Sequence, residues 1–66
     1  MKTYSVSVWD HEAEDFVPRY YRLSARKAVE AVRQLEIEGY DREASIYVAR
    51  NYTKAEIAEQ RTKLKH

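Results

Sequence analysis

The sequence has 66 residues, with twelve Lys and Arg against eleven Asp and Glu, and it contains no Cys. A chain of this length buries only about 60% of the surface that it exposes when unfolded, so we expect one thin core and a single domain, residues 1–66. The near-neutral charge argues against phosphate binding by the whole surface, the lack of Cys fits a reducing cytoplasm, and no apolar run is long enough to cross a membrane.

The chain opens with a predicted β-hairpin. Residues 3–9 alternate between apolar and polar side chains, which is typical of a half-buried strand. Residues 16–23 are rich in Val and Tyr and predict a second strand. Pro18 cannot donate a hydrogen bond to a neighbouring strand, so this second strand belongs at the edge of the sheet.

A helix over residues 25–38 is the next predicted element. Ser24 is a favourable N-cap, and Ala28, Val29, Val32 and Leu35 recur at the spacing of one helical face. Gly39, the only glycine, follows where a left-handed residue commonly ends a helix. We expect this stripe to pack on one face of the sheet.

The rest of the chain predicts a third strand and a second helix. Residues 43–50 alternate again, and Thr53 with Glu56 forms a capping box that opens a helix running to the C-terminus. The second helix has few apolar residues, so it is expected to dock loosely. The fold class is α+β, a small two-layer ββαβα domain whose antiparallel three-stranded sheet has the order 2-1-3.

The sheet face opposite the main helix is the first candidate binding surface. Aromatic side chains are predicted to lie there among small polar residues and an arginine, namely Ser5, Ser7, Trp9, Tyr20, Arg22, Ser45, Tyr47 and Ala49. Bases stack on such rings, so the face could bind single-stranded nucleic acid. Cover by the C-terminal helix or by a second subunit is the competing interpretation, because small residues suit close packing.

The hairpin loop is the second candidate. Asp10, Glu12, Glu14 and Asp15 make it acidic, and the spacing matches no metal-loop motif, so no metal site is predicted. A solvated loop is the simpler interpretation. Alternatively, the loop is a negative patch that docks on a basic groove of another protein.

Ile37 is a third candidate contact for a partner. It falls outside the helical stripe, so an ideal helix leaves it in water. The alternative is that the helix ends early and turns Ile37 inward beside Tyr40.

A basic group forms the alternative nucleic-acid surface, with the residues Arg19, Tyr20, Arg22, Arg26 and Lys27. These side chains lie near the start of the main helix, where the helix dipole disfavours cations, and this mild misfit is compatible with phosphate binding. A solvated face is the simpler interpretation.

Catalysis has little support in the sequence. Cys is absent, no Gly-rich phosphate loop occurs, and no metal-ligand set or nucleophile motif is present. The sequence therefore predicts a protein that is not an enzyme and takes no cofactor.

Residues 20–25 (YYRLSA) leading into residues 28–32 (AVEAV), with a short hairpin before them and one strand after, resemble in layout very small phage and mobile-element proteins, anti-CRISPR inhibitors among them. The resemblance implies a compact protein that blocks or redirects a larger host complex. We thus expect a small non-catalytic interaction domain with a protein partner, and a homodimer is compatible with it. The alternative is a nucleic-acid-binding module.

Overall fold

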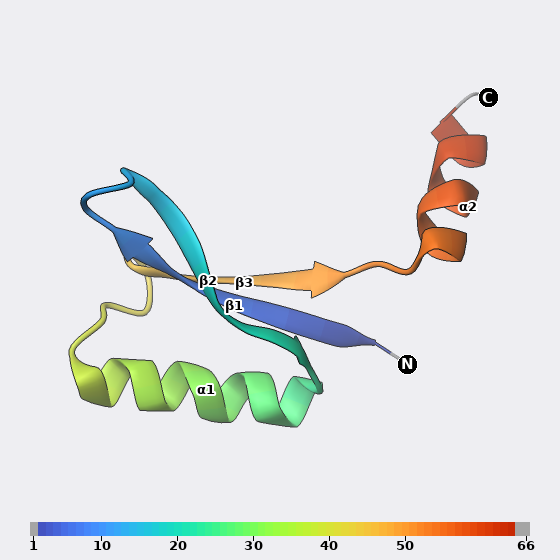
Figure 1. Cartoon of the computed structure of the whole chain (residues 1–66). Coiled ribbons are helices and arrows are strands. Elements are labelled where there is room, and N and C mark those ends of the chain that lie inside the picture. Colours follow the sequence, from blue (N-terminus) through green and yellow to red (C-terminus); the bar gives the residue numbers. More distant parts are fainter. Residues whose placement is uncertain (1, 65–66) are drawn as a thin grey trace.

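A computed structural model describes residues 2–64 of the chain. Its elements follow the predicted order ββαβα, which confirms the α+β fold class (Figure 1). They are β1 (Thr3–Asp10), β2 (Asp15–Leu23), α1 (Ala25–Glu38), β3 (Ile46–Asn51) and α2 (Lys54–Leu64). Residues 65 and 66, which the sequence placed in the second helix, lie outside the described residues.

The sheet has three strands in the order β2-β1-β3, and both pairs of neighbours are antiparallel, as predicted. β1 is the central strand, so both edges of the sheet are formed by strands with one free side. α1 lies against one face of this sheet, and the opposite face carries no helix (Figure 1). We call this opposite face the open face.

The core lies between α1 and the central strand. Val6 and Leu35 are the large side chains with no exposed surface. The other buried apolar residues are Val8, Ala28, Ala31, Val32 and Ile46, with Tyr4, Tyr20, Leu23 and Tyr40 partly buried around them. The helical stripe predicted from the sequence therefore packs on the sheet, except at Val29, which is 53% exposed.

Both predicted caps of α1 are present. The Ser24 hydroxyl accepts a hydrogen bond from the Lys27 amide at 3.3 Å, which satisfies one of the free N–H groups of the first turn. Gly39 ends the helix with φ of 110°, and the Tyr40 amide donates to the Leu35 carbonyl at 3.0 Å. These local bonds explain why the helix boundaries agree with the sequence-based prediction.

β2 departs from the alternation that the sequence suggested. Its register against β1 shifts at two places, between the partners of Tyr4 and Val6 and between those of Val6 and Ser7. Each shift is a bulge that adds a residue to β2 and reverses the side on which the following side chains point. Simple alternation along β2 therefore does not give the face of the sheet to which each of its side chains points.

These bulges correct the predicted position of two tyrosines. Tyr20 was placed on the open face, but it lies opposite Val6 and packs against the core on the helix side. Strict alternation along residues 16–23 predicts that Tyr21 faces the helix, but it is 65% exposed. Arg22 has a positive φ of 53° at the bulge, so its direction also escapes the alternating pattern.

β3 begins at Ile46 rather than at residue 43. The preceding residues form a turn around Asp41, whose carboxylate accepts from the Glu43 amide at 3.0 Å and whose carbonyl accepts from the Ser45 amide at 2.8 Å. Asp side chains compete in this way with a strand ladder for nearby amides. The turn thus shortens the strand at its start.

Glu14 adopts a left-handed conformation in the hairpin loop, with φ of 52°. An L-residue with a β-carbon loses about 1 kcal/mol or more there, whereas glycine does not. We expect Glu14→Gly to raise the free energy of unfolding by about 0.5 kcal/mol once the greater freedom of glycine in the unfolded chain is subtracted. Urea denaturation measures the change, and Glu12→Gly is the control at a loop position without positive φ. A Glu14→Gly variant less stable than the wild type would contradict the assigned loop geometry.

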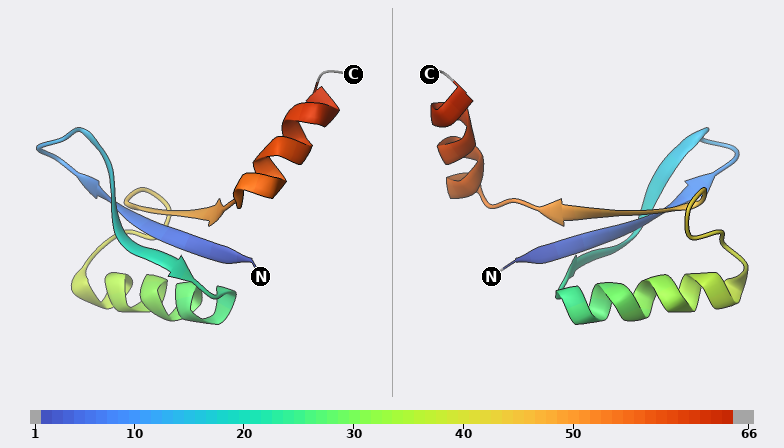
Figure 2. Two further views of the ribbon diagram at one scale, coloured as in Figure 1. Left: turned by 45° about the vertical axis from the view of Figure 1, so that its right-hand side comes forward. Right: turned by 180° about the vertical axis from the view of Figure 1, so that it is seen from behind.

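α2 extends away from the rest of the molecule (Figure 2). Within residues 2–64 its backbone packs on none of the other helices or strands, and the Arg50–Glu56 ion pair links it to β3. The chain measures 44 × 27 × 16 Å. The hairpin tip and α2 both rise on the side of the open face, one at each end of the sheet (Figures 1 and 2). Of the helices between residues 2 and 64, none has the length and apolar character needed to cross a membrane.

Candidate functional site

The open face of the sheet is formed by side chains that point away from α1. Register and alternation place there Ser5, Ser7, Trp9, Phe16, Pro18, Tyr47, Ala49 and Asn51. α2 does not cover this face, which rules out one of the two covers expected from the sequence. The predicted positions of Trp9 and Tyr47 on this face are confirmed.

Three aromatic rings meet at the hairpin end of the open face, and we call Trp9, Phe16 and Tyr47 the aromatic cluster. The centroids of Trp9 and Phe16 are 5.3 Å apart at an interplanar angle of 76°, an edge-to-face contact. Phe16 lies 5.7 Å from Tyr47 at 46°. Rings from all three strands of the sheet therefore form one contiguous apolar surface.

Ser7 explains how rings from the two edge strands can touch across the central strand. It lies in register between Pro18 of β2 and Tyr47 of β3, and only 8% of it is exposed. A larger side chain at this position would hold Phe16 and Tyr47 apart. The small residue that the sequence analysis took as a sign of a covered face instead lies beneath the aromatic cluster.

Phe16 is the member of the cluster that sequence reasoning missed. It was assigned to the second strand without a face, because the bulges of β2 obscure the alternation. The available signal was the loop, since a closed hairpin with Asp10 opposite Asp15 necessarily places Trp9 opposite Phe16. Counting outward from the loop would have found the pair.

The acidic hairpin loop adjoins the aromatic cluster, because the Asp10–Asp15 pair follows the Trp9–Phe16 pair in the ladder. Two of its carboxylates shape the backbone. Asp10 accepts from the Glu12 amide at 2.8 Å and Asp15 accepts from the Phe16 amide at 2.7 Å. Glu12 and Glu14 are exposed, and no ion pair between described residues involves them. The structure thus brings the predicted loop and open-face residues to one end of the molecule.

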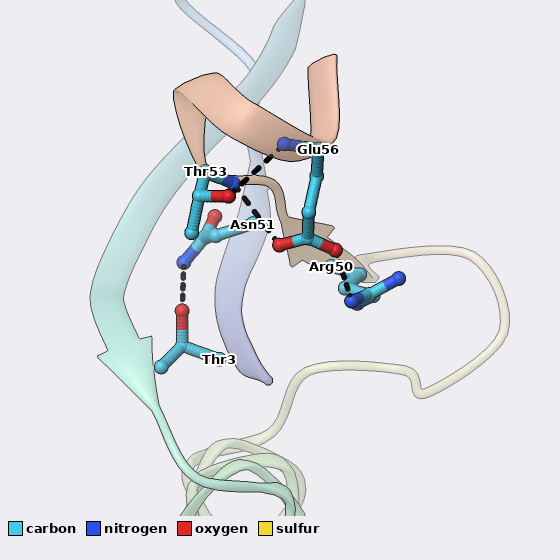
Figure 3. A network of polar contacts seen from close by, with 5 residues as sticks. All are labelled: Thr3, Arg50, Asn51, Thr53 and Glu56. Carbon is cyan, nitrogen blue, oxygen red and sulfur yellow. Dashed lines mark hydrogen bonds and ion pairs between the residues drawn. The ribbon is translucent and has the colours of Figure 1, made fainter. Parts of the chain in front are cut away.

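At the other end of the open face the side chains are polar. The Ser5 hydroxyl donates to Asn51 Oδ1 at 2.8 Å. Asn51 Nδ2 donates to the Thr3 hydroxyl at 3.5 Å (Figure 3). These bonds join β1 to the end of β3. The open face therefore changes from aromatic at the hairpin end to hydrogen-bonded and polar where α2 begins.

The predicted capping box at the start of α2 is present. The Thr53 amide donates to Glu56 Oε1 and the Glu56 amide donates to Thr53 Oγ1, each at 3.2 Å, while Arg50 pairs with Glu56 Oε2 (Figure 3). Arg50 also lies over the Tyr52 ring, 4.7 Å from its centroid. The Thr53 amide, with help from the charge of Arg50, lowers the pKa of Glu56 below its usual value, although desolvation opposes them.

This pKa shift predicts how α2 responds to acid. Because the folded-state pKa of Glu56 is below the unfolded one, its contribution is present above the unfolded pKa and is lost as the pH falls through the folded pKa. We expect Glu56→Gln to reduce helical circular dichroism at neutral pH and to abolish the acid-induced loss of α2. Glu30→Gln in α1 is the control, and this variant should still lose α2 in acid as the wild type does. An unchanged acid response in Glu56→Gln would show that Glu56 does not hold the helix start.

The basic residues of the alternative nucleic-acid surface do not form one patch. Arg19 pairs with Glu38 at 3.7 Å at the end of α1, whereas Lys27 pairs with Glu30 at 3.7 Å in its first turns. Lys27 and Glu38 are about 16 Å apart along the axis of α1. With Tyr20 on the helix side, this group lacks the aromatic platform that the alternative needs.

Ile37 lies on the outer side of α1 and is 79% exposed, so the helix does not turn it inward. It is isolated from the aromatic cluster, which occupies the opposite face of the sheet. An isolated exposed apolar residue is common on protein surfaces. It carries no site by itself.

A groove of about 740 Å³ lies on the helix side between α1 and β3 and is lined in part by Tyr4, Val29, Val32 and Val48. It exists because α1 leaves β3 incompletely covered, so that Val48 is 44% exposed. This is also why Val29 faces solvent instead of the core. Across residues 2–64, no three His, Asp or Glu side chains come together as a possible metal site.

No family model, curated protein or solved structure matches this chain.

Proposed function

We propose that this chain is a non-catalytic protein-binding domain that uses the aromatic cluster and the adjoining acidic loop as its interface. The observation that carries the proposal is the contiguous aromatic surface of Trp9, Phe16 and Tyr47 on a sheet face that no element between residues 2 and 64 covers. Tyr47 is 55% exposed, so its ring is accessible to a partner. Tryptophan and tyrosine are enriched among the residues that contribute most to protein interfaces.

The charge next to the cluster favours a partner with a basic surface. Glu12 and Glu14 are exposed in the loop that follows the Trp9–Phe16 pair, so a complementary surface would have an apolar pocket with basic residues at its rim. Charges at a rim mainly speed association and select partners, whereas buried rings hold the complex together. Such a protein would act by blocking or redirecting a larger complex, in keeping with an inhibitor of phage or mobile-element type. The lack of Cys supports a cytoplasmic location.

A matched pair of tyrosines tests the proposal. Tyr47 and Tyr21 are both largely exposed, at 55% and 65%, yet only Tyr47 belongs to the aromatic cluster. In affinity capture from a lysate of the source organism, we expect Tyr47→Ala to lose the captured protein and Tyr21→Ala to retain it. Circular dichroism of both variants checks that the fold is intact. Equal capture by the two variants would refute the aromatic interface.

The acidic loop is tested separately with Glu12→Lys and Glu14→Lys combined, because neither side chain holds the turn. We expect the association rate with the captured partner to fall at low salt and to approach that of the wild type at high salt. Glu43→Lys, a charge reversal outside the loop, is the control. Retention of single-stranded DNA or RNA that weakens steeply with salt would favour the nucleic-acid alternative instead.

A further inference from the structure

β3 presents a free edge whose hydrogen-bonding groups can be assigned from the register. The Trp9 amide donates to the Ser45 carbonyl at 2.9 Å, and these two residues are directly opposite each other. In an antiparallel pair such hydrogen-bonded positions alternate, so Tyr47, Ala49 and Asn51 also point their backbone groups toward β1. The N–H and C=O groups of Ile46, Val48 and Arg50 therefore point outward, where no described element pairs with them.

The opposite edge of the sheet is blocked by its own sequence. Pro18 lies opposite Ser7, whose backbone groups face β3, so the missing N–H of Pro18 is on the outer side of β2. Two bulges, with Arg22 at a positive φ, distort the rest of that edge. Bulges and prolines are two of the devices by which proteins prevent edge pairing. β3 carries none of them, because it is in continuous register with β1 and contains neither Pro nor Gly.

The chain also exposes more surface than a compact monomer of its size. Its accessible surface is 5683 Å², whereas a globular monomer of this mass exposes about 4,400 Å². Its radius of gyration is 14.2 Å against about 11 Å for a compact domain of this length. The excess of roughly 1,300 Å² is larger than the ~800 Å² that each partner buries in an interface of standard size. The sequence has no Cys to stabilise so thin a core by disulfides.

We propose that two copies of the chain pair antiparallel along β3, so that their sheets join into one. Val48 lies on the two-fold axis and faces Val48 of the second copy, while Ile46 faces Arg50. This register pairs every outward backbone group of the strand with its counterpart. A shift by one pair in either direction would leave Ile46 or Arg50 opposite residues outside the strand.

The side chains of β3 are compatible with this self-pairing. On the open face Tyr47 lies opposite Ala49 of the second copy, a large ring against a methyl group, and the register opposes no like charges. Tyr47 and Val48, at 55% and 44% exposed, lose solvent on opposite faces of the strand. Asn51 comes to lie opposite Ser45 of the second copy, so α2 starts beside the other sheet and contributes to burying the excess surface.

A second copy fits the edge better than an extended peptide from another protein. A chain that buries so little surface by itself needs a partner against the β3 edge while it folds. A second copy of the same chain is present during folding, so it can supply that contact. A two-fold axis also makes the contact closed and self-complementary, with the same residues used on both sides. The pairing uses the backbone edge of β3, whereas Trp9 and Phe16 of the aromatic cluster belong to β1 and β2, so the two contacts share Tyr47 alone.

Charge substitution at the axis tests the pairing, because residue 48 meets its own copy. We expect the wild type to have twice the monomer mass by light scattering, and Val48→Lys and Val48→Glu each to have the monomer mass. An equimolar mixture of the two variants should return to the dimer mass. Val17→Lys is the control, since Val17 is a similarly exposed valine, at 38%, on the helix side of the opposite edge, and this variant should stay dimeric.

Amide exchange in the wild type gives a second readout that needs no variant to fold. We expect the outward amides of Ile46, Val48 and Arg50 to be protected in the dimer. A monomeric wild type, rapid exchange at these amides, or a Val48→Lys variant that folds and stays dimeric would each overturn the proposal. Val48→Lys leaves the aromatic cluster unchanged, so we measure its capture of an outside partner beside its mass, and we measure the mass of Tyr47→Ala beside its capture. Failure of dimerisation and failure of the proposed function are then distinguishable.

Discussion

Leu35→Ala is expected to unfold most of the protein under native conditions or to lower its melting temperature by 10 °C or more. Leu35 has no exposed surface, and removing a fully buried leucine costs about 2 to 5 kcal/mol. A domain of this length has a total stability of roughly 3 to 10 kcal/mol, and each kcal/mol shifts the midpoint by about 4 to 8 °C. The substitution therefore removes a large part of the available stability.

Ile37→Ala is the matched control, because it deletes a side chain of the same size from the same helix. Ile37 is 79% exposed, so we expect a change in the free energy of unfolding within about 0.5 kcal/mol. Thermal and urea denaturation followed by circular dichroism measure both variants. Equal destabilisation by the two substitutions would mean that α1 packs on the sheet through a different face.

Gly39→Ala should destabilise the protein by about 1 to 2 kcal/mol through the backbone alone. Gly39 has φ of 110°, which residues with a β-carbon rarely adopt, and an added β-carbon would meet no atom within 4 Å. The cost is therefore conformational strain without a clash. Gly39→Asn should be less harmful than Gly39→Ala, since asparagine tolerates left-handed conformations better.

A synthetic chain with D-alanine at position 39 separates strain from steric effects. The D-residue favours positive φ and has less freedom than glycine when unfolded, so we expect it to equal or exceed the stability of the wild type. Loss of stability with both alanine enantiomers would instead indicate an unfavourable contact of the methyl group. Urea denaturation of the three chains decides between these cases.

The parts of the fold that could be predicted are those whose signals are local. Ser24 and Gly39 mark the ends of α1 through hydrogen bonds that their own neighbours complete. The order of the sheet follows from a short hairpin and a right-handed crossover. Thr53 and Glu56 predicted the start of α2 in the same way, because both hydrogen bonds of a capping box form within one helical turn.

The face of Tyr20 could not be predicted, because the bulges of β2 leave no mark in the residues themselves. Tyr20, Tyr21 and Arg22 are all acceptable strand residues, and Arg22 adopts positive φ without being glycine or asparagine. The register of β2 at the bulges is set by contacts with β1 that lie 14 to 19 residues away in sequence, at the end of the hairpin far from its loop. The face of Trp9 and Tyr47 was predicted correctly for the opposite reason, since β1 and β3 pair in regular register.

The contrast between the two sheet edges also limits how far such assemblies can grow. Within the described residues, Pro18 and the bulges of β2 disfavour pairing at one edge of the sheet, whereas β3 carries no such block at the other. If two copies join along β3 as proposed, β2 forms both outer margins of the joined sheet, and we expect growth to stop at the pair. Pro18→Val would restore a backbone N–H donor on the outer edge of β2. Of the two chains, this variant is therefore the one that we expect to form filaments more readily.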